Sequence, residues 1–416
     1  MSMWQIILKS LRQHWLSTLL AVIAIACGSS LLISVVSLRE QAHHNFTQVG
    51  LGVDAILGPK GSPLQIVLNA LYHLEEMPGK IKWTYYRAVL EDPLVEMGVP
   101  FCTGHSYGGF RVNAVEPSFF THFEYRPGKH FSFAPGEGGI GRLFRERHEA
   151  VAGWAAAREL KIRPGVTFNP VCGVTMGDPV HVNDTITFVG IMAPTGTPHD
   201  RAIYIPLTTF YTLEGHGKKV AEMAQDEEHR EISGAYITVR KIRGGAVHPG
   251  IQGLAYTINQ SKGAQLIVPG EVLPRLFSII GWVDRVLFAI ALLVTILAVL
   301  FLFVALIAAL RERRRDIALM RSLGATRWTV FGLVMSESLL ITLAGGAVGL
   351  CLGHGIVSIG SFYIRAETGL RFTPLYLCQA DIYLIPALIL LGIATGLIPA
   401  IQAYRLSILK NLTPLS

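Results

Sequence analysis

Four long apolar segments divide the chain, and each is long enough to cross a membrane as a helix. They run over residues 16–38, 278–310, 329–359 and 382–403. A spanning helix needs about 20 mostly apolar residues. At a rise of about 1.5 Å per residue the second segment is about 50 Å long, more than the roughly 30 Å of a hydrocarbon core. It predicts a helix that projects from the membrane as a stalk, with tilt as the alternative.

Residues 39–277 follow a different pattern, in which short apolar runs alternate with polar residues, glycine and proline. The strand-like runs are Phe110–Val115, Pro179–Val182, Ile186–Met192 and Ala235–Val239. The helix-like runs are Ser62–Glu75, Ala150–Leu160 and Lys218–His229. We therefore predict an α-helical membrane protein with four transmembrane helices and a large α+β domain inserted between the first and second.

Residues 1–15 precede the first span and carry apolar side chains at helical spacing, at Trp4, Ile7, Leu8 and Leu11. This pattern predicts an amphipathic helix on the membrane surface. The first span has two rival interpretations, a cleaved signal peptide or a lipoprotein signal ending at Cys27. Its apolar stretch is longer than the ~7–15 residues typical of signal peptides and continues past Cys27, so a retained helix is favoured.

The composition agrees with a membrane protein. Hydrophobic residues make up 51% of the 416 residues and charged residues only 16%, against about 25% charged in soluble domains. A net charge of +7 is compatible with nucleic acid or with an anionic membrane surface. The densest basic run, Arg311–Arg315, directly follows an apolar segment, which favours the membrane and no nucleic acid.

The basic residues near the spans also predict an orientation. Arginine and lysine occur before the first span, in residues 311–328 and in the tail 404–416. These three segments lie on one side of the membrane, which we assign to the cytoplasm. Residues 39–277 and the loop 360–381 then lie outside.

The pentapeptide Gly104-His105-Ser106-Tyr107-Gly108 fits the G-x-S-x-G pattern of a serine nucleophile. That motif requires a strand, a sharp turn and then a helix. The residues from Phe110 onward alternate like a strand instead. We therefore expect a tight turn here and no catalytic residue.

Metal ligands are the next candidates, because 12 of the 14 histidines lie between His43 and His248. Their spacings are scattered, and they form no H-E-x-x-H motif and no compact Cys/His group. We expect surface or hydrogen-bonded histidines and no metal site. A Cys102–Cys172 disulfide in an oxidising compartment is left open.

The sequence offers no phosphate-binding loop. Glycine–lysine pairs occur at Gly79-Lys80, Gly128-Lys129 and Gly217-Lys218, and none is followed by serine or threonine, as a Walker A loop requires. We expect no cofactor to be bound directly. If ATP drives this protein, a separate chain binds it.

Two features of the third apolar segment suggest packing. Gly345, Gly349 and Gly353 recur every four residues, and such small-residue faces let helices approach closely, either within one chain or in a dimer. Glu337 lies about two turns inside the segment. An ionisable group there is usually paired, and an arginine of the preceding cytoplasmic helix is the expected partner.

The connection over residues 311–328 is the most informative passage. Ile317, Met320 and Leu323 recur at i, i+3 and i+6, with Leu319 alongside, and predict a short apolar stripe on a basic helix. Gly324 is placed to end that helix. Thr326 is placed to cap the next one. The passage predicts a helix on the membrane surface that presents a face to a partner; the alternative is an arginine cluster that only sets orientation.

This passage resembles the cytoplasmic segment of the FtsX/MacB-type (type VII) ABC permeases. The resemblance lies in a basic run, an acidic residue, a short apolar helix and Leu323-Gly324-Ala325-Thr326, with Glu337-Ser338 downstream. The layout of one helix, a large outer domain and three helices is similar too. Asp316 stands where the family more often has glutamate. Weaker similarity to MacB-like outer domains lies in Gly177–Val182, Val189–Gly196 and Ala150–Leu160.

The resemblance implies mechanotransmission in a bacterial inner (plasma) membrane. Two permease chains, identical or different, would sit on two copies of a separate cytoplasmic ABC ATPase, which would bind ATP and Mg²⁺. ATPase-driven movement of residues 311–326 would pass along the stalk to the outer domain, with no pore through the spans. The residues implied in ATPase coupling are Arg313, Arg315, Asp316, Ile317, Leu319, Met320, Arg321, Leu323, Gly324, Ala325 and Thr326.

Several functions are compatible with this membrane architecture. The leading one is movement of a lipoprotein, peptide or other amphiphilic substrate. Its expected partners are membrane lipids and a periplasmic or lipoprotein partner. The second is a non-transporting relay that activates a cell-wall hydrolase. The third is an anchored serine hydrolase using Ser106, and the fourth, suggested only by the histidines, is metal export.

Overall fold

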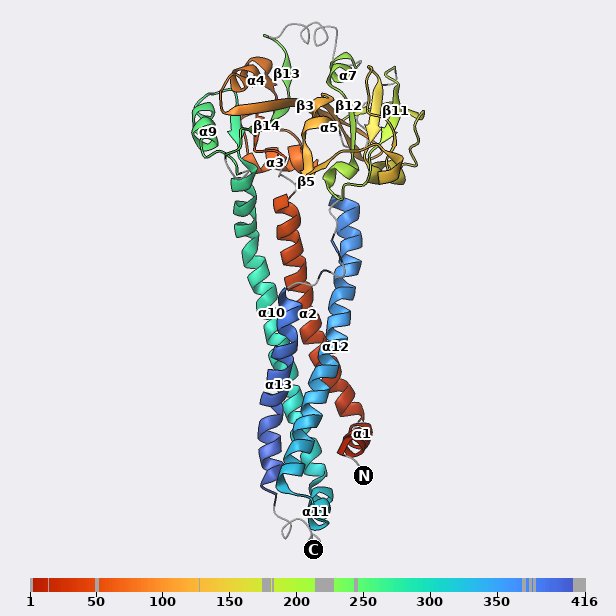
Figure 1. Ribbon diagram of the computed structural model, residues 1–416, viewed down its shortest axis with the longest axis vertical. Helices are drawn as coiled ribbons and strands as arrows, with labels where there is room; N and C mark the ends of the chain where they lie inside the picture. The colour runs from red at the N-terminus through yellow and green to blue at the C-terminus, as the bar shows by residue number, and fades with distance from the viewer. Residues whose placement is uncertain are drawn as a thin grey trace. The chain divides into compact units, whose positions relative to one another are not determined.

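The computed structural model describes residues 3–13, 15–48, 52–126, 128–173, 181, 183–213, 228–242, 246–368, 372–373, 376 and 379–406. The chain forms two compact units, shown in Figure 1. The helical unit comprises Met1–Ala42, Ile280–Phe362 and Phe372–Ser416. The α+β unit comprises His43–Ile279 and Tyr363–Arg371.

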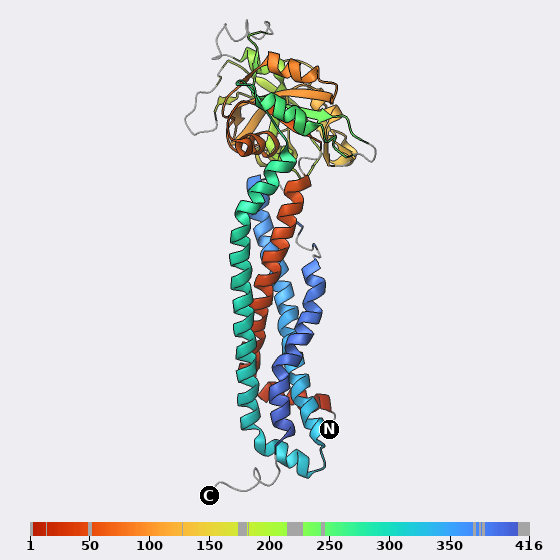
Figure 2. The ribbon, with the colours of Figure 1, turned by 90° about the vertical axis from the view of Figure 1, so that its left-hand side faces the viewer.

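In the described residues, the helical unit consists of four long helices and two short ones. They are α1 (Met3–Gln13), α2 (Trp15–Gln48), α10 (Pro269–Glu312), α11 (Arg314–Ser322), α12 (Arg327–Thr368) and α13 (Gln379–Tyr404). Within the described residues, four of them are long and apolar enough to cross a membrane, namely α2, α10, α12 and α13. The predicted number of spans is therefore confirmed. These four run side by side, with α1 and α11 toward one end of the unit (Figures 1 and 2).

Three of these helices extend well beyond the apolar segments that predicted them. The first continues to Gln48, the second begins at Pro269 and the third continues to Thr368. Polar contacts lie along the extension of α2, which a search for apolar residues does not detect. Arg39 pairs with Asp284 at 3.5 Å, and the Gln41 side-chain oxygen accepts a hydrogen bond from the Thr373 amide at 2.7 Å.

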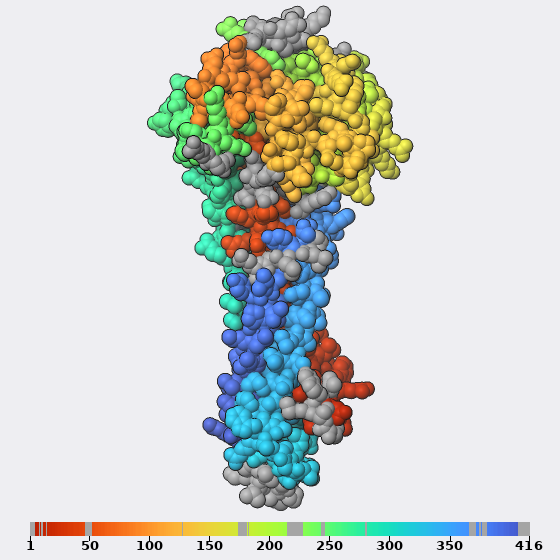
Figure 3. Space-filling model, viewed as in Figure 1, coloured from red at the N-terminus to blue at the C-terminus, as the bar shows by residue number. Residues whose placement is uncertain are grey.

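The packing of the helical unit depends on close backbone approach. Gly28 of α2 lies against Thr295 of α10, where an added Cβ would approach the Thr295 side chain to 3.0 Å. The Ser338 hydroxyl of α12 donates to the Gly392 carbonyl of α13 at 2.8 Å. Hydroxyl-to-carbonyl bonds of this kind are favoured where little water competes. In Figure 3 the visible side of this unit is formed largely by α11, α12 and α13.

The α+β unit has strands and short helices, as predicted. Its strands are β1 (Ala55–Gly58), β2 (Ile81–Lys82), β3 (Val95–Tyr107), β4 (Phe110–Val115), β5 (Glu124–Arg126), β6 (Lys129–His130), β7 (Ile140–Gly141), β8 (Glu149–Ala152), β9 (Thr167–Phe168), β10 (Val171–Cys172), β11 (Ile186–Ile191), β12 (Ala202–Pro206), β13 (Glu231–Ile232), β14 (Gly234–Val239) and β15 (Gln265–Ile267). Its α-helices are α3 (Pro63–Tyr72), α4 (Trp83–Leu90), α5 (Ser118–His122), α6 (Trp154–Glu159), α7 (Leu207–Thr212) and α9 (Ile251–Asn259). The 3₁₀ turns are Pro135–Glu137 and Pro198–Arg201.

One mixed sheet organises this unit. In the described part of the chain it has 11 strands, nine of them in the order β15-β1-β14-β3-β4-β12-β8-β11-β7, with β10 on β3 and β9 on β11. The β4–β12 and β8–β11 pairs are parallel, and the remaining pairs are antiparallel. Its middle strands are buried, with Val112, Ile203 and Ala150 each at most 1% exposed. Such double-sided burial explains their continuous apolar runs.

Local predictions in this unit were correct for strands and less so for helices. The Phe110–Val115 strand is confirmed, and β11 and β14 match two others. Ala150–Leu160 is not one helix, because its first residues form β8 at the centre of the sheet and only Trp154–Glu159 is helical. Between them, an added Cβ at Gly153 would meet the Asp200 and His199 carbonyl oxygens. Most of Pro179–Val182 and Lys218–His229 lies outside the described residues.

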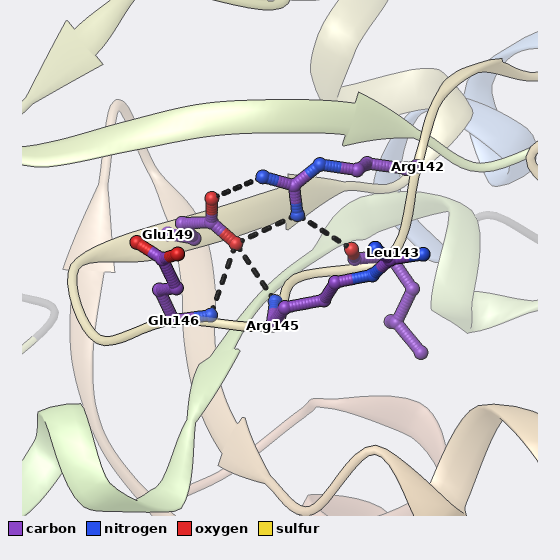
Figure 4. A network of polar contacts seen from close by, with 5 residues as sticks. All are labelled: Arg142, Leu143, Arg145, Glu146 and Glu149. Carbon is purple, nitrogen blue, oxygen red and sulfur yellow. Dashed lines mark hydrogen bonds and ion pairs between the residues drawn. The ribbon is translucent and has the colours of Figure 1, made fainter.

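A carboxylate organises the turn before β8 (Figure 4). Glu149 accepts hydrogen bonds from the backbone amides of Arg145 at 2.7 Å and Glu146 at 3.1 Å. It also pairs in bidentate fashion with the Arg142 guanidinium. The Arg142 hydrogen bond is the main cause that holds the pKa of this carboxyl at about 2.

We expect Glu149→Gln to destabilise the α+β unit by about 1–3 kcal/mol, because charge-assisted bonds to the turn are lost. Since the folded pKa lies below the unfolded value of about 4.3, the Glu149 contribution is present above that pH and disappears as the pH falls toward 2. Thermal unfolding of the full chain from pH 7 to pH 3 measures it. Glu159→Gln is the control, since Glu159 is 61% exposed in its pair with Arg201 and should change stability by less than about 1 kcal/mol.

Candidate coupling site

Helix α11 has well-defined ends. The Ala325 amide donates to the Met320 carbonyl at 3.1 Å and the Gly324 amide to the Arg321 carbonyl at 3.2 Å, the two bonds of a Schellman motif. Gly324 has a φ of 104°, which favours glycine. The Thr326 hydroxyl accepts from the Thr329 amide at 3.1 Å. Both predicted boundaries, a stop at Gly324 and a cap at Thr326, are confirmed.

One face of α11 packs against the bundle. Ile317 and Ala318 are each 4% exposed. The apolar cluster that contains Ile317 also includes Leu310, Val330, Val334, Ala400 and Ala403. These residues come from α10, α12 and α13, so α11 is held by the ends of three spanning helices.

The predicted apolar stripe is only partly correct. Ile317 is buried, but Leu323 is 88% exposed and Leu319 is 45% exposed. Six residues along a helix with about 3.6 residues per turn rotate a side chain by about 240°, so Ile317 and Leu323 do not share a face. Ala318 joins Ile317 on the packed side instead.

Arg313 and Glu337 form the predicted buried ion pair. One guanidinium nitrogen lies 3.3 Å from each carboxylate oxygen. The two side chains are 13% and 8% exposed. A pair with so little access to water fixes the start of α11 against α12, and removing either partner would leave the other charge buried without this ion pair.

The other end of α11 is fixed by contacts that sequence reasoning missed. The Arg321 guanidinium donates to the Leu406 carbonyl just beyond α13. The Trp328 ring lies 5.3 Å from the Tyr404 ring, and the Arg327 guanidinium lies 5.9 Å above the same ring. The paired residues are more than 70 positions apart in sequence, so local patterns gave no signal for them.

The remaining side chains of α11 and its C-cap face outward. We call this set the α11 surface, and it comprises Arg314, Arg315, Asp316, Leu319, Ser322 and Leu323, all exposed. Met320 and Ala325 lie at its edge, half-buried. Exposed leucines rimmed by charges are typical of a protein-binding surface. The α11 surface thus combines exposed leucines with basic side chains, on a helix whose other face packs against the spanning helices.

Comparison with known proteins bears on both units. Residues 18–246, more than half of the chain, match the MacB-like periplasmic core domain, and residues 288–408 match the FtsX-like permease C-terminal domain. The chain belongs to the FtsX/MacB-like ABC transporter permease family. The expected resemblance is thereby confirmed, and with it a multi-pass membrane permease with an α+β outer domain.

Individual relatives of this permease are distant. The macrolide export ATP-binding/permease protein MacB of Bordetella avium (strain 197N) is 30% identical over 31% of this chain and 20% of its own length. The cell division protein FtsX of Mycobacterium tuberculosis (strain ATCC 25618 / H37Rv) is 26% identical over 33% of this chain and 46% of its own length. The periplasmic region of MacB from Actinobacillus actinomycetemcomitans overlaps 55% of this chain and 94% of that chain, at 10% identity and a TM-score of 0.32. The chain therefore spans less than half the length of the two sequence relatives.

The glycine stripe of the permease packs within the chain. Ideal Cβ atoms built on Gly345 and Gly353 would approach Ile25 to 2.8 Å and Ile33 to 3.0 Å. One on Gly349 would collide with the Ser29 hydroxyl and approach the Ala26 carbonyl to 2.9 Å. The stripe thus lies against α2, and this face of α12 is occupied without a second chain.

We expect Gly349→Val to destabilise the helical unit by about 1–3 kcal/mol, because its side chain has no room against α2. Gly355→Val is the matched control, since nothing lies within 4 Å of an added Cβ there. Thermal unfolding of both variants in the same detergent makes the comparison. Equal destabilisation would mean that helix propensity, and not close packing, explains the effect.

The serine-hydrolase motif is not a nucleophile elbow in this permease. Ser106 lies in β3, and a turn at Gly108 and Gly109 leads into β4, so strand follows strand. The Ser106 hydroxyl donates to the Gly173 carbonyl at 2.6 Å. The motif therefore forms a hairpin, as its residues predicted.

The disulfide left open by the sequence does not form. Cys102 and Cys172 are both free thiols. Cys172 lies opposite His105 in the β10–β3 pair, three residues beyond Cys102. Cys102 is buried, with its sulfur 3.7 Å from the Tyr211 hydroxyl, and burial raises the pKa of its thiol to about 11.

Proposed function

We propose that this permease is the membrane subunit of an ABC transporter that works by mechanotransmission. A separate cytoplasmic ATPase binds the α11 surface, and its ATP-driven movements pass through the spanning helices to the α+β unit. A second permease chain completes the complex. The observation that carries this proposal is the α11 surface, whose helix is fixed to three spanning helices while Leu319 and Leu323 face outward.

The spanning helices support a mechanical role more than a pore. A pocket of about 100 Å³ between them is lined mainly by aliphatic side chains such as Ile25, Leu302 and Leu388, together with four serine and threonine side chains. A water molecule occupies about 30 Å³ of liquid volume, so this pocket is too small for a peptide or lipid. Helix α10 is a single helix of 44 residues, well beyond the roughly 20 needed to cross a bilayer, which suits a lever.

The α+β unit offers a place for an amphiphilic substrate. A groove of about 520 Å³ is lined by apolar side chains, among them Val247, Val268 and Leu273. The polar side chains of Asp54, His248, Gln252 and Glu271 also line it. Its size lies within the range of ligand sites, about 300–1,000 Å³. Apolar walls that also carry polar and charged side chains suit a lipoprotein, peptide or other amphiphile.

Orientation follows from the basic residues around the spans. Arg12 of α1, the arginines of α11 and Arg405 after α13 belong to the same unit, and α11 contacts the end of α13 through Arg321 and Leu406. The positive-inside rule then assigns both chain ends and α11 to the cytoplasm. The α+β unit lies outside, and the host membrane is a bacterial inner membrane.

Affinity purification of the tagged full-length chain from its native cells, in mild detergent or native lipid discs, tests this function. We expect a nucleotide-binding chain to co-purify and the eluate to hydrolyse ATP in the presence of Mg²⁺. A chain that purifies folded but without any ATPase under all of these conditions would rule the function out.

A further inference from the structure

Three potential metal ligands meet in the α+β unit, although they are far apart in sequence. They are His105 of β3, Cys172 of β10 and His181 in the segment that precedes β11. One ring nitrogen from each histidine and the cysteine sulfur all lie within 4.8 Å of one another. The β10–β3 pairing places Cys172 directly opposite His105, so the sheet itself brings two of the ligands together.

The distances suit a tetrahedral ion. The Nε2 atoms of His105 and His181 are 3.1 Å apart. Zinc binds imidazole nitrogen at about 2.0–2.1 Å and thiolate at about 2.3 Å, so two nitrogens in a tetrahedral shell are about 3.3 Å apart and a nitrogen and a sulfur about 3.6 Å apart. The three side chains need to move only slightly to close around one ion. A proton shared between the two imidazoles would account for the 3.1 Å between their Nε2 atoms. It would not account for the Cys172 thiol beside them.

The surroundings hold these ligands in place. The His181 amide donates to the Pro170 carbonyl at 3.0 Å, and the Asn169 side chain donates to the His181 carbonyl at 2.8 Å. Both partners lie immediately before β10, so His181 is tied to the strand that carries Cys172. The His105 and Phe210 rings pack edge to face, with ring centroids 5.1 Å apart.

Asp184 is placed to orient His181. A carboxylate oxygen lies 3.7 Å from Nδ1 of His181, while Nε2 of the same ring points at His105. Histidines that bind metals through one nitrogen commonly present the other to a carboxylate, which fixes the ring and its tautomer. His105, His181 and Asp184 are buried, whereas Cys172 is half-buried and leaves an approach for an ion.

We propose that His105, Cys172 and His181 bind one thiophilic transition-metal ion such as Zn²⁺, with Asp184 orienting His181. The sulfur binds as thiolate, so its proton is released to water as the ion enters. Three side chains leave one position of a four-coordinate shell for water or another donor. The ion links β3, β10 and the segment before β11, and thereby stabilises this part of the unit.

This proposal departs from the expectation that the histidines bind no metal. The ligands come from three segments that are far apart along the chain, so no compact motif indicates them in the sequence. The proposal does not depend on an ATPase partner or on the groove lined by Val247 and Leu273. It would hold for the α+β unit of a transporter or of a relay alike.

Cobalt substitution in the purified full-length permease tests the site, because a Co²⁺–thiolate bond gives a charge-transfer absorption that imidazole ligands alone do not. After removal of metals with a chelator, we expect one Co²⁺ per chain with this band, displaced by Zn²⁺. Cys172→Ser should abolish the band and weaken Zn²⁺ binding at least tenfold. Cys102→Ser is the control, since Cys102 is a free thiol outside the cluster, and should keep both.

Two further variants distinguish the loss of a metal ligand from a general loss of folded structure. Asp184→Asn leaves the three ligands in place and should weaken Zn²⁺ binding about 10–100-fold while keeping the thiolate band. His181→Gln should lose a ligand and bind more weakly still. A wild-type chain without stoichiometric Co²⁺ or Zn²⁺ binding would overturn the proposal. So would a thiolate band that persists in Cys172→Ser.

Discussion

Leu323→Glu is expected to abolish binding of the proposed ATPase while leaving the permease folded. The Leu323 side chain is 88% exposed, so a carboxylate there meets no packed neighbour. At the centre of a binding surface, losing such an apolar anchor typically costs about 2 kcal/mol or more, which is roughly 30-fold in affinity. Co-purification of the ATPase and ATP hydrolysis by the complex are the readouts.

The matched control is Val166→Glu. Val166 is 41% exposed in the α+β unit, so the same chemical change is made away from the α11 surface. It should leave ATPase retention and stability unchanged. If Leu323→Glu retains the ATPase as well as the wild type does, α11 is not the main contact and another cytoplasmic segment must carry the coupling.

The second large effect is expected at the buried ion pair. Glu337→Gln leaves the Arg313 guanidinium without its carboxylate in a site where the two side chains are 13% and 8% exposed. Breaking a buried pair from one side costs about 3–5 kcal/mol. We expect a marked fall in the unfolding temperature of the helical unit, together with weaker ATPase coupling, because the start of α11 is no longer fixed.

A double variant separates the pair from its individual partners. Arg313→Met combined with Glu337→Leu removes both charges and keeps apolar volume, and such replacements are often close to neutral. We expect the double variant to be more stable than either single change. Additive losses in the double variant would show that the two residues act independently and that their 3.3 Å contact contributes little.

The permease architecture was predictable from sequence because its signals are local. The spans appear as apolar runs, and the ends of α11 as Gly324 and Thr326. The partner of Glu337 followed from a general rule, since a carboxylate inside a span needs a cation. Each of these inferences needs only residues that are near one another along the chain.

What sequence could not supply depends on contacts between distant segments. The Ala150–Leu160 run has helical composition, yet its start is a strand because β12 and β11 lie on either side of it. The glycine stripe left two interpretations until Ile25 and Ile33 of α2 were found against it. The meeting of His105, Cys172 and His181 follows from the β10–β3 pairing, which no local pattern indicates.

Photo-crosslinking from position 323 in intact membranes tests the central claim most directly. A photoreactive residue is placed at Leu323, and in a parallel chain at Tyr256, which is 70% exposed in the α+β unit. The account predicts that position 323 forms an adduct with a nucleotide-binding chain and that position 256 does not. An ATPase adduct from position 256, or none from position 323 in a complex that hydrolyses ATP, would contradict it.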